Sequence, residues 1–206
     1  MRHRAPVRSG LDGLEALGYA PNIATLSVPV GYEALKGAQT DVFLGNWMPA
    51  QAAFREDLDA DGGVTELAQN LEGAKFTLAV NPAAAALGVA DFADLDAHRD
   101  AFEGKIYGIE PGAPANQNIQ GMIDADLFGL GDWELVESGE QAMLAQVTRN
   151  ADTPTVFLAW APHPMNEAIE ITYLPMRWAP GWTASPRWTG SPAWMPCRPP
   201  SPDNSP

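Results

Sequence analysis

Three aromatic side chains occupy positions where a predicted strand begins or ends. Trp47 follows a short apolar run, Phe76 opens the predicted strand Phe76–Val80, and Trp160 closes the predicted strand Thr155–Trp160. In open α/β sheets, ligands bind beyond the carboxyl ends of the strands, so side chains at such positions can face a cleft. The three rings are therefore candidates for contact with a ligand.

Ring faces suit one class of ligand in particular. A trimethylammonium group has no N–H donor and cannot be held by ordinary hydrogen bonds, but aromatic faces within about 6 Å attract it by roughly 0.5–2 kcal/mol each. Three or four rings together could supply ~8 kcal/mol, which corresponds to micromolar affinity. By position alone, however, a tryptophan after an apolar strand is more often part of a core or an interface.

Other chemistry has less support in the sequence. His3, His98 and His163 are scattered and Cys197 is the only cysteine, so we expect no metal site, no intrachain disulfide and no cofactor. His163 stands between two prolines and reads as a turn residue. An acidic carbohydrate hydrolase is a remote alternative, for which Glu110 would be the first carboxylate to mutate, because no carboxylate pair lies in a recognisable motif.

The chain is strongly acidic. It carries 26 Asp and Glu against 12 Lys and Arg in 206 residues, a formal net charge of −14. This charge disfavours nucleic acid as a partner and suits a cationic ligand, although it can equally serve only to keep the protein in solution.

The first 75 residues predict alternating helices and strands. Leu11, Leu14 and Leu17 fall at helical spacing before Gly18, a helix-stop signal. Further helices are predicted at 31–37, 50–60 and 64–71, and strands at 22–28 and 41–44.

The alternation continues to about residue 174. We predict strands at 76–80, 105–110 and 155–160 and helices at 91–102 and 140–149, the second helix opened by a capping box from Ser138 to Gln141. Such alternation indicates an α/β fold with a largely parallel sheet in each lobe.

Residues 175–206 have a different composition. They hold nine of the 19 prolines and four of the seven tryptophans and show no helical or strand period. Runs so rich in proline form neither a helix nor a central strand, so we expect a disordered tail.

Four long motifs occur in order along the chain: Asp41-Val-Phe-Leu-Gly-Asn-Trp-Met-Pro49, Lys105-Ile-Tyr-Gly-Ile-Glu-Pro-Gly112, Gly139-Glu-Gln-Ala-Met-Leu-Ala-Gln-Val147 and Phe157-Leu-Ala-Trp-Ala-Pro-His-Pro-Met165. Together they resemble the choline-binding proteins of ABC importers, members of the wider glycine betaine and proline betaine binding family. The resemblance runs over about residues 11–174.

The resemblance implies an α/β periplasmic binding protein of two lobes, type II-like, with an incomplete first lobe. It divides the chain into a partial first lobe at 1–75, a second lobe at 76–171, and a hinge return with an aberrant tail at 172–206. Such a protein is not an enzyme. It captures choline or glycine betaine as a monomer and delivers it to an ABC permease in the inner membrane.

The resemblance also assigns site residues. Trp47 and Trp160 match two tryptophans of a box of four aromatics, and Phe76 stands where the choline binders usually carry tyrosine. A family asparagine follows the Glu-Pro-Gly turn where this chain has Ala113, with Asn116 and Asn118 a few residues away, and we take Asn116 as the candidate ligand-binding residue. The fourth aromatic and an acidic partner come from a Trp-Thr-Asp-like segment that has no match here.

The two ends lead to further expectations. The basic start of residues 1–10 is followed by no apolar run, so we expect no signal peptide although the resemblance implies a periplasmic location. We also expect a late start and a frameshift after about residue 174. A non-functional truncated fragment of such a binding protein is therefore the main alternative.

Overall fold

The computed structural model describes residues 5–48 and 51–175. Within these residues the chain forms two compact units. The first unit contains the residues up to Lys75 and the segment Trp160–Ile169, and the second contains Phe76–Ala159 and the residues from Glu170 onward. The predicted tail beyond Pro175 lies outside the described residues.

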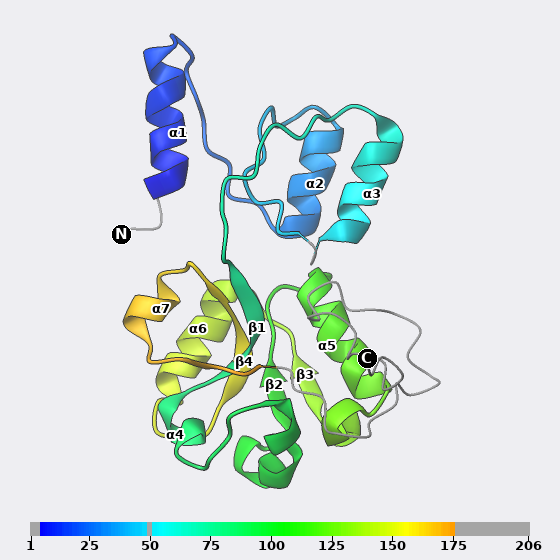
Figure 1. Ribbon diagram of the computed structural model, residues 1–206, viewed down its shortest axis with the longest axis vertical. Coiled ribbons are helices and arrows are strands. Elements are labelled where there is room, and N and C mark those ends of the chain that lie inside the picture. Colours follow the sequence, from blue (N-terminus) through cyan, green and yellow to red (C-terminus); the bar gives the residue numbers. More distant parts are fainter. Residues whose placement is uncertain (1–4, 49–50, 176–206) are drawn as a thin grey trace, which may run out of the picture. The chain divides into compact units, whose positions relative to one another are not determined.

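The described part of the first unit is mainly helical and contains α1 (Ala5–Ala16), α2 (Val28–Lys36), α3 (Ala52–Asp61) and α7 (Met165–Ala168). A proline in the first turn starts α2, where its missing N–H costs nothing, and Gly62 ends α3 in the left-handed conformation at φ 68°. Helices α2 and α3 lie side by side (Figure 1), and Tyr32 of α2 packs against Phe43 and Phe54. The predicted helices near Leu11, at 31–37 and at 50–60 are confirmed as α1, α2 and α3.

Three other predictions for the first unit are wrong. Residues 22–27 and 41–44 form no strand, and 64–71 form no helix. Strands need a neighbour to satisfy their backbone groups, and no strand ladder forms in these segments. The predicted sheet in the first lobe is thus missing from the described residues.

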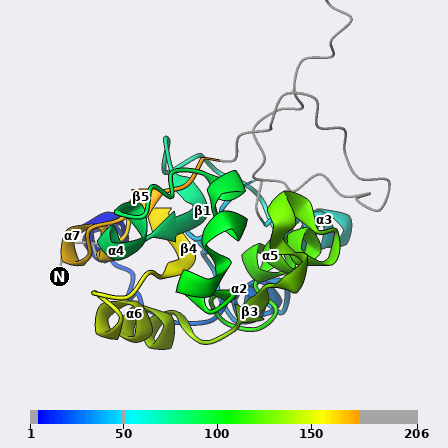
Figure 2. The same ribbon diagram turned by 90° about the horizontal axis from the view of Figure 1, so that it is seen from below.

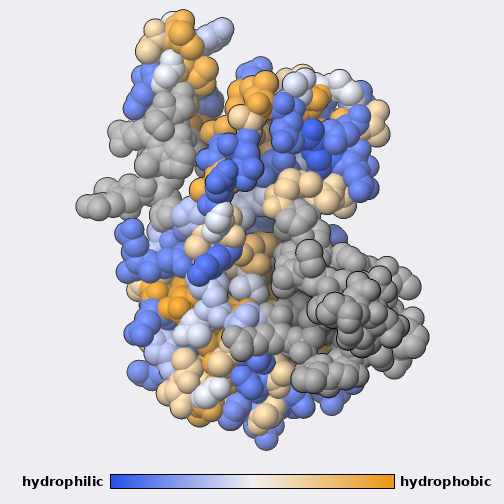
Figure 3. All heavy atoms as spheres, viewed as in Figure 1, coloured by the Kyte–Doolittle hydropathy of each residue, from blue (hydrophilic) through white to orange (hydrophobic). Residues whose placement is uncertain are grey.

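Exposed apolar side chains gather in the same part of the chain. Of the 11 large apolar side chains that are exposed among the described residues, ten precede Lys75, and Leu67 is 87% exposed. Figure 3 shows hydrophobic patches over the end of α1 and beside α2. The strand predictions at 22–28 and 41–44 rest on such apolar runs, in which Ile23, Leu26, Val42 and Leu44 stay exposed.

The second unit is built on a five-stranded sheet. Its strands are β1 (Lys75–Val80), β2 (Lys105–Tyr107), β3 (Glu134–Val136), β4 (Val156–Ala161) and β5 (Thr172–Tyr173). They are ordered β3-β2-β4-β1-β5; β2 is parallel to β3 and β4, and β5 is antiparallel to β1 (Figures 1 and 2). The predicted strands 76–80 and 155–160 are confirmed, whereas β2 ends three residues earlier than predicted.

Helices surround this sheet. They are α4 (Pro82–Ala85), α5 (Pro114–Asp124) and α6 (Glu140–Arg149), with 3-10 turns η1 (Phe92–Asp94), η2 (Asp96–Phe102) and η3 (Leu127–Asp132). In both ribbon views β4 lies between α5 and α6 (Figures 1 and 2). Leu78, Ile106 and Phe157 are fully buried in the core of the unit. The α/β prediction is therefore confirmed.

Local details differ from the predictions. Residues 91–102 form the two 3-10 segments η1 and η2 instead of one α-helix. Asp91 and Asp94 form a capping box at η1, and His98 has a non-helical backbone inside η2. The predicted helix 140–149 is confirmed, but Gly139 is its N-cap and makes no side-chain cap, so the capping box from Ser138 is wrong. Helix α5 and strand β3 were not predicted from the sequence.

None of the helices in 5–48 and 51–175 combines the length and apolar character needed to cross a bilayer.

Candidate functional site

Trp47 lies in an irregular segment of the first unit and is partly buried. Gln51 holds the Trp47 backbone at both the carbonyl and the N–H. The backbone N–H of Gln51 donates to the carbonyl of Trp47 at 3.0 Å, and the N–H of Trp47 donates to Gln51 Oε1 at 3.1 Å. These two bonds to a buried residue hold the Trp47 backbone in a segment that has no helix or sheet ladder.

Tyr32 supports the same segment from α2. Its hydroxyl lies 2.9 Å from Gln51 Oε1 and 2.7 Å from Asn46 Oδ1, and the side chain is only 3% exposed. Burial raises the pKa of Tyr32 to about 12, with the nearby Arg55 charge opposing that rise. The phenol therefore remains a neutral donor across the physiological pH range.

Trp160 is partly exposed near the end of β4. Its ring centroid lies 5.0 Å from that of His163, with the two planes tilted by 55°. The amide of Asn166 donates to the carbonyl of Trp160 at 2.8 Å, and the backbone N–H of Met165 donates to His163 Nδ1 at 3.2 Å. A cis peptide joins Ala161 to Pro162 in this turn.

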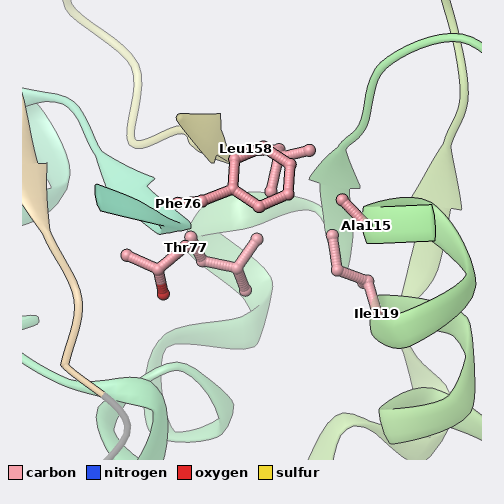
Figure 4. A pocket seen from close by; sticks show the side chains of 6 residues that line it. Phe76, Thr77, Ala115, Ile119 and Leu158 are labelled. Atoms are coloured by element: carbon pink, nitrogen blue, oxygen red, sulfur yellow. The ribbon is translucent and has the colours of Figure 1, made fainter. Parts of the chain in front are cut away.

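Phe76 lies at the start of β1 in the second unit and lines a narrow apolar hollow. Ala115 and Ile119 of α5 and Leu158 of β4 contribute to the same hollow. Figure 4 shows the Phe76 ring beside Leu158, with Ala115 and Ile119 facing it from α5. This apolar setting lowers the local dielectric around the ring, which strengthens any attraction to a cation.

Asn116 is 2% exposed, and its amide is surrounded by protein partners. Oδ1 accepts from the N–H of Ile109 at 3.0 Å, while Nδ2 lies 2.9 Å from the Ile109 carbonyl, 3.1 Å from the Glu110 carbonyl and 2.8 Å from Glu137 Oε1. These contacts hold the loop that follows β2. Every polar atom of the amide is thus used within the second unit.

The sequence-predicted residues fall in both units. Trp47 and Trp160 belong to the first, and Phe76 and Asn116 belong to the second, where α5 carries Asn116 directly after Ala115 of the Phe76 hollow. Sequence reasoning missed Tyr32, Gln51 and Glu137. Single polar residues within apolar stretches gave no spacing signal that could have found them.

No group of three or more His, Cys, Asp or Glu side chains in the described ranges is arranged to hold a metal ion.

Comparison with known proteins gives the class of protein to which the chain belongs. Residues 12–198 match the family of substrate-binding domains of ABC-type glycine betaine transport systems, and the chain is a member of that family. The match extends beyond Leu174, where we expected the resemblance to end.

Solved structures agree with the family. An ABC-transporter choline-binding protein in complex with choline is 49% identical with a TM-score of 0.75, over 82% of this chain and 60% of that one. An unliganded, semi-closed choline-binding protein is 51% identical with a TM-score of 0.68, over 78% and 57%. The two-lobed periplasmic binding protein fold that we predicted is thereby confirmed as the fold class.

Two further proteins are similar to this chain, one by fold and one by sequence. The glycine betaine complex of lactococcal OpuAC is 24% identical with a TM-score of 0.68, over 78% of this chain and 61% of that one, a likeness of fold alone. An uncharacterised ORF1 protein of Chromohalobacter salexigens is 47% identical over 104 residues, which is 50% of this chain and 67% of that protein. The chain spans about 60% of the choline-bound structure that it matches.

Proposed function

We propose that this chain is the solute-binding component of an ABC importer and that it captures choline, with glycine betaine as the nearest alternative ligand. The observation that carries the proposal is the 49% identity to a choline-bound binding protein over 82% of the chain. The family is one of transport proteins and not an enzyme class, which favours ligand binding over carbohydrate hydrolysis.

In this proposal the quaternary ammonium contacts the faces of Trp47, Phe76 and Trp160. Each of the three side chains is partly buried. The apolar hollow beneath Phe76 and the hydrogen-bonded backbone of Trp47 support rings that are held in place before the ligand arrives. Preorganised rings lose little conformational entropy on binding, which favours affinity.

Charge supports a cationic ligand over an anionic one. The net charge of −14 raises the local concentration of cations near the protein. Choline carries a net positive charge, whereas glycine betaine adds a carboxylate that needs its own hydrogen-bond donors. Asn116 serves in this proposal by shaping the loop at Ile109 and Glu110, because its own amide is occupied.

The remaining parts of the proposal follow from the family. The protein would act outside the inner membrane as a monomer and deliver its ligand to an ABC permease. Binding would be saturable and would proceed without turnover of the ligand.

Calorimetric titration tests the proposal. We expect micromolar binding of choline, weaker binding of glycine betaine, and loss of choline binding in Trp160→Ala. Tyr19→Ala is the control, since Tyr19 is 66% exposed and takes no part in the proposed cage. Absence of heat with both ligands would contradict the proposal and favour the non-functional fragment.

A further inference from the structure

Trp47 needs an anchor that the secondary structure does not give it. Residues 41–48 carry no helix or strand, so no ladder of backbone hydrogen bonds fixes the segment. A ring that contributes to a cation cage must nevertheless be held near one orientation, because the attraction falls away once the cation leaves the ring face.

Gln51 supplies the first link of such an anchor. Its backbone N–H and its side-chain Oε1 engage the carbonyl and the N–H of Trp47, at 3.0 and 3.1 Å. Gln51 is 7% exposed and stands at the N-cap of α3, where its side chain makes no cap. The side chain is therefore committed to the Trp47 segment instead of to its own helix.

Tyr32 supplies the second link. Its hydroxyl reaches Gln51 Oε1 at 2.9 Å and Asn46 Oδ1 at 2.7 Å, so it contacts the residue before Trp47 and the residue that holds Trp47. The ring itself is fixed by Phe54, stacked at 5.1 Å, and by Phe43, edge-on at 5.1 Å. A rigid aromatic cluster thus determines where the hydroxyl lies.

We propose that Tyr32 and Gln51 are positioning residues for ligand binding. Together with Asn46 they form a Trp47 clamp: the aromatic cluster fixes the Tyr32 hydroxyl, and the hydroxyl helps to fix the segment that carries the Trp47 ring. The inference rests on the proposed function, because it assumes that Trp47 contacts the ligand. In this inference Tyr32 acts through the side chains of Asn46 and Gln51, the second of which accepts from the Trp47 N–H.

The test is a double-mutant cycle on choline affinity, measured by calorimetry with the full chain. Tyr32→Phe removes one hydroxyl and keeps the ring, and we expect it to weaken choline binding by about five- to tenfold, the value of one buried hydrogen bond. In the Trp47→Ala background the same change should weaken binding by less than about twofold, because the ring it positions is gone.

Tyr19→Phe is the matched control, since Tyr19 is an exposed tyrosine of the same unit, and its affinity should equal that of the wild type. An equal loss from Tyr32→Phe in both backgrounds would mean that the hydroxyl acts on stability alone, and it would overturn the inference. No loss in either background would overturn it as well.

Hydrogen exchange separates this inference from the proposed function. In the absence of ligand, the Trp47 amide should exchange faster in Tyr32→Phe than in the wild type, because Gln51 Oε1 loses its anchor. If the wild type binds no choline, the proposed function fails, and the exchange rate alone decides the clamp. Faster exchange then supports the clamp, and unchanged exchange overturns it.

Discussion

The side-chain amide of Asn116 pairs with the backbone of Ile109 in both directions. Its Oδ1 accepts from the Ile109 N–H at 3.0 Å, and its Nδ2 donates to the Ile109 carbonyl at 2.9 Å. The Ile109 carbonyl also accepts from the backbone N–H of Ser138 at 3.0 Å, so backbone and side-chain hydrogen bonds together hold the loop that follows β2.

Loss of that amide should destabilise the second unit. Asn116→Ala leaves the buried N–H of Ile109 without its partner, while the Ile109 carbonyl keeps its bond from the Ser138 N–H, so we expect the free energy of unfolding to fall by about 1–3 kcal/mol. Urea unfolding measures the change. Asn118→Ala, at a partly exposed position on the same helix, should stay within about 0.5 kcal/mol of the wild type. Equal losses in the two variants would refute the role of the pairing.

Gly108 has no side chain and therefore leaves room for the Asn116 amide. A Cβ at this position would lie 2.6 Å from Asn116 Oδ1 and 3.0 Å from Leu135 Cδ1. We expect Gly108→Ala to lower the free energy of unfolding by about 1–3 kcal/mol, because the amide must move away from Ile109. Gly13→Ala, in the open interior of α1, should instead be stabilising by about 0.5–1 kcal/mol. A neutral Gly108→Ala would show that the loop can shift freely.

Tyr32 should make the first unit sensitive to alkaline pH. Its folded pKa of about 12 lies above the ordinary value of 10, so its contribution to stability is complete below pH 10 and is lost as pH rises from 10 to 12. The wild type should therefore lose up to about 2 kcal/mol relative to Tyr32→Phe across this window. Unfolding of both proteins by urea at pH 8, 10, 11 and 12 measures the difference. A constant difference over this range would contradict the prediction.

Phe76 should contribute its ring face to binding. Phe76→Leu keeps the apolar hollow filled but removes the π-system, and we expect about a tenfold loss of choline affinity. Phe76→Tyr restores the residue that choline binders usually carry and should remain within about threefold of the wild type. Calorimetric titration of both variants, with melting temperatures to monitor folding, compares them. If leucine and tyrosine behave alike, the ring face is not the source of affinity.

The sequence predicted the second unit better than the first, for a physical reason. Segments such as 76–80 and 155–160 have apolar side chains that enter a core and strands that find neighbours, so pattern and structure agree. Segments such as 22–28 and 41–44 carry equally apolar patterns, yet Ile23 and Val42 are exposed and no ladder forms there. A local pattern cannot report whether a partner strand is present.

The candidate site likewise contains some residues that the sequence could predict and others that it could not. Trp47, Phe76 and Trp160 were accessible to sequence reasoning because they stand beside apolar runs and within motifs that resemble a family. The residues that hold Trp47 could not be found from the sequence, because the hydrogen bonds of Tyr32 with Asn46 and Gln51 join positions 14 and 19 residues apart. Such long-range polar contacts leave no periodic trace in a sequence.

Comparison of choline with its neutral isostere 3,3-dimethylbutan-1-ol tests the central claim most directly, because the two differ only in the charge at the quaternary centre. If aromatic faces bind the cation, choline should bind about 100-fold more tightly than the isostere, as expected for three rings of roughly 1 kcal/mol each. Equal affinities would show that the site recognises only shape, and an absence of choline binding would contradict the proposed function itself.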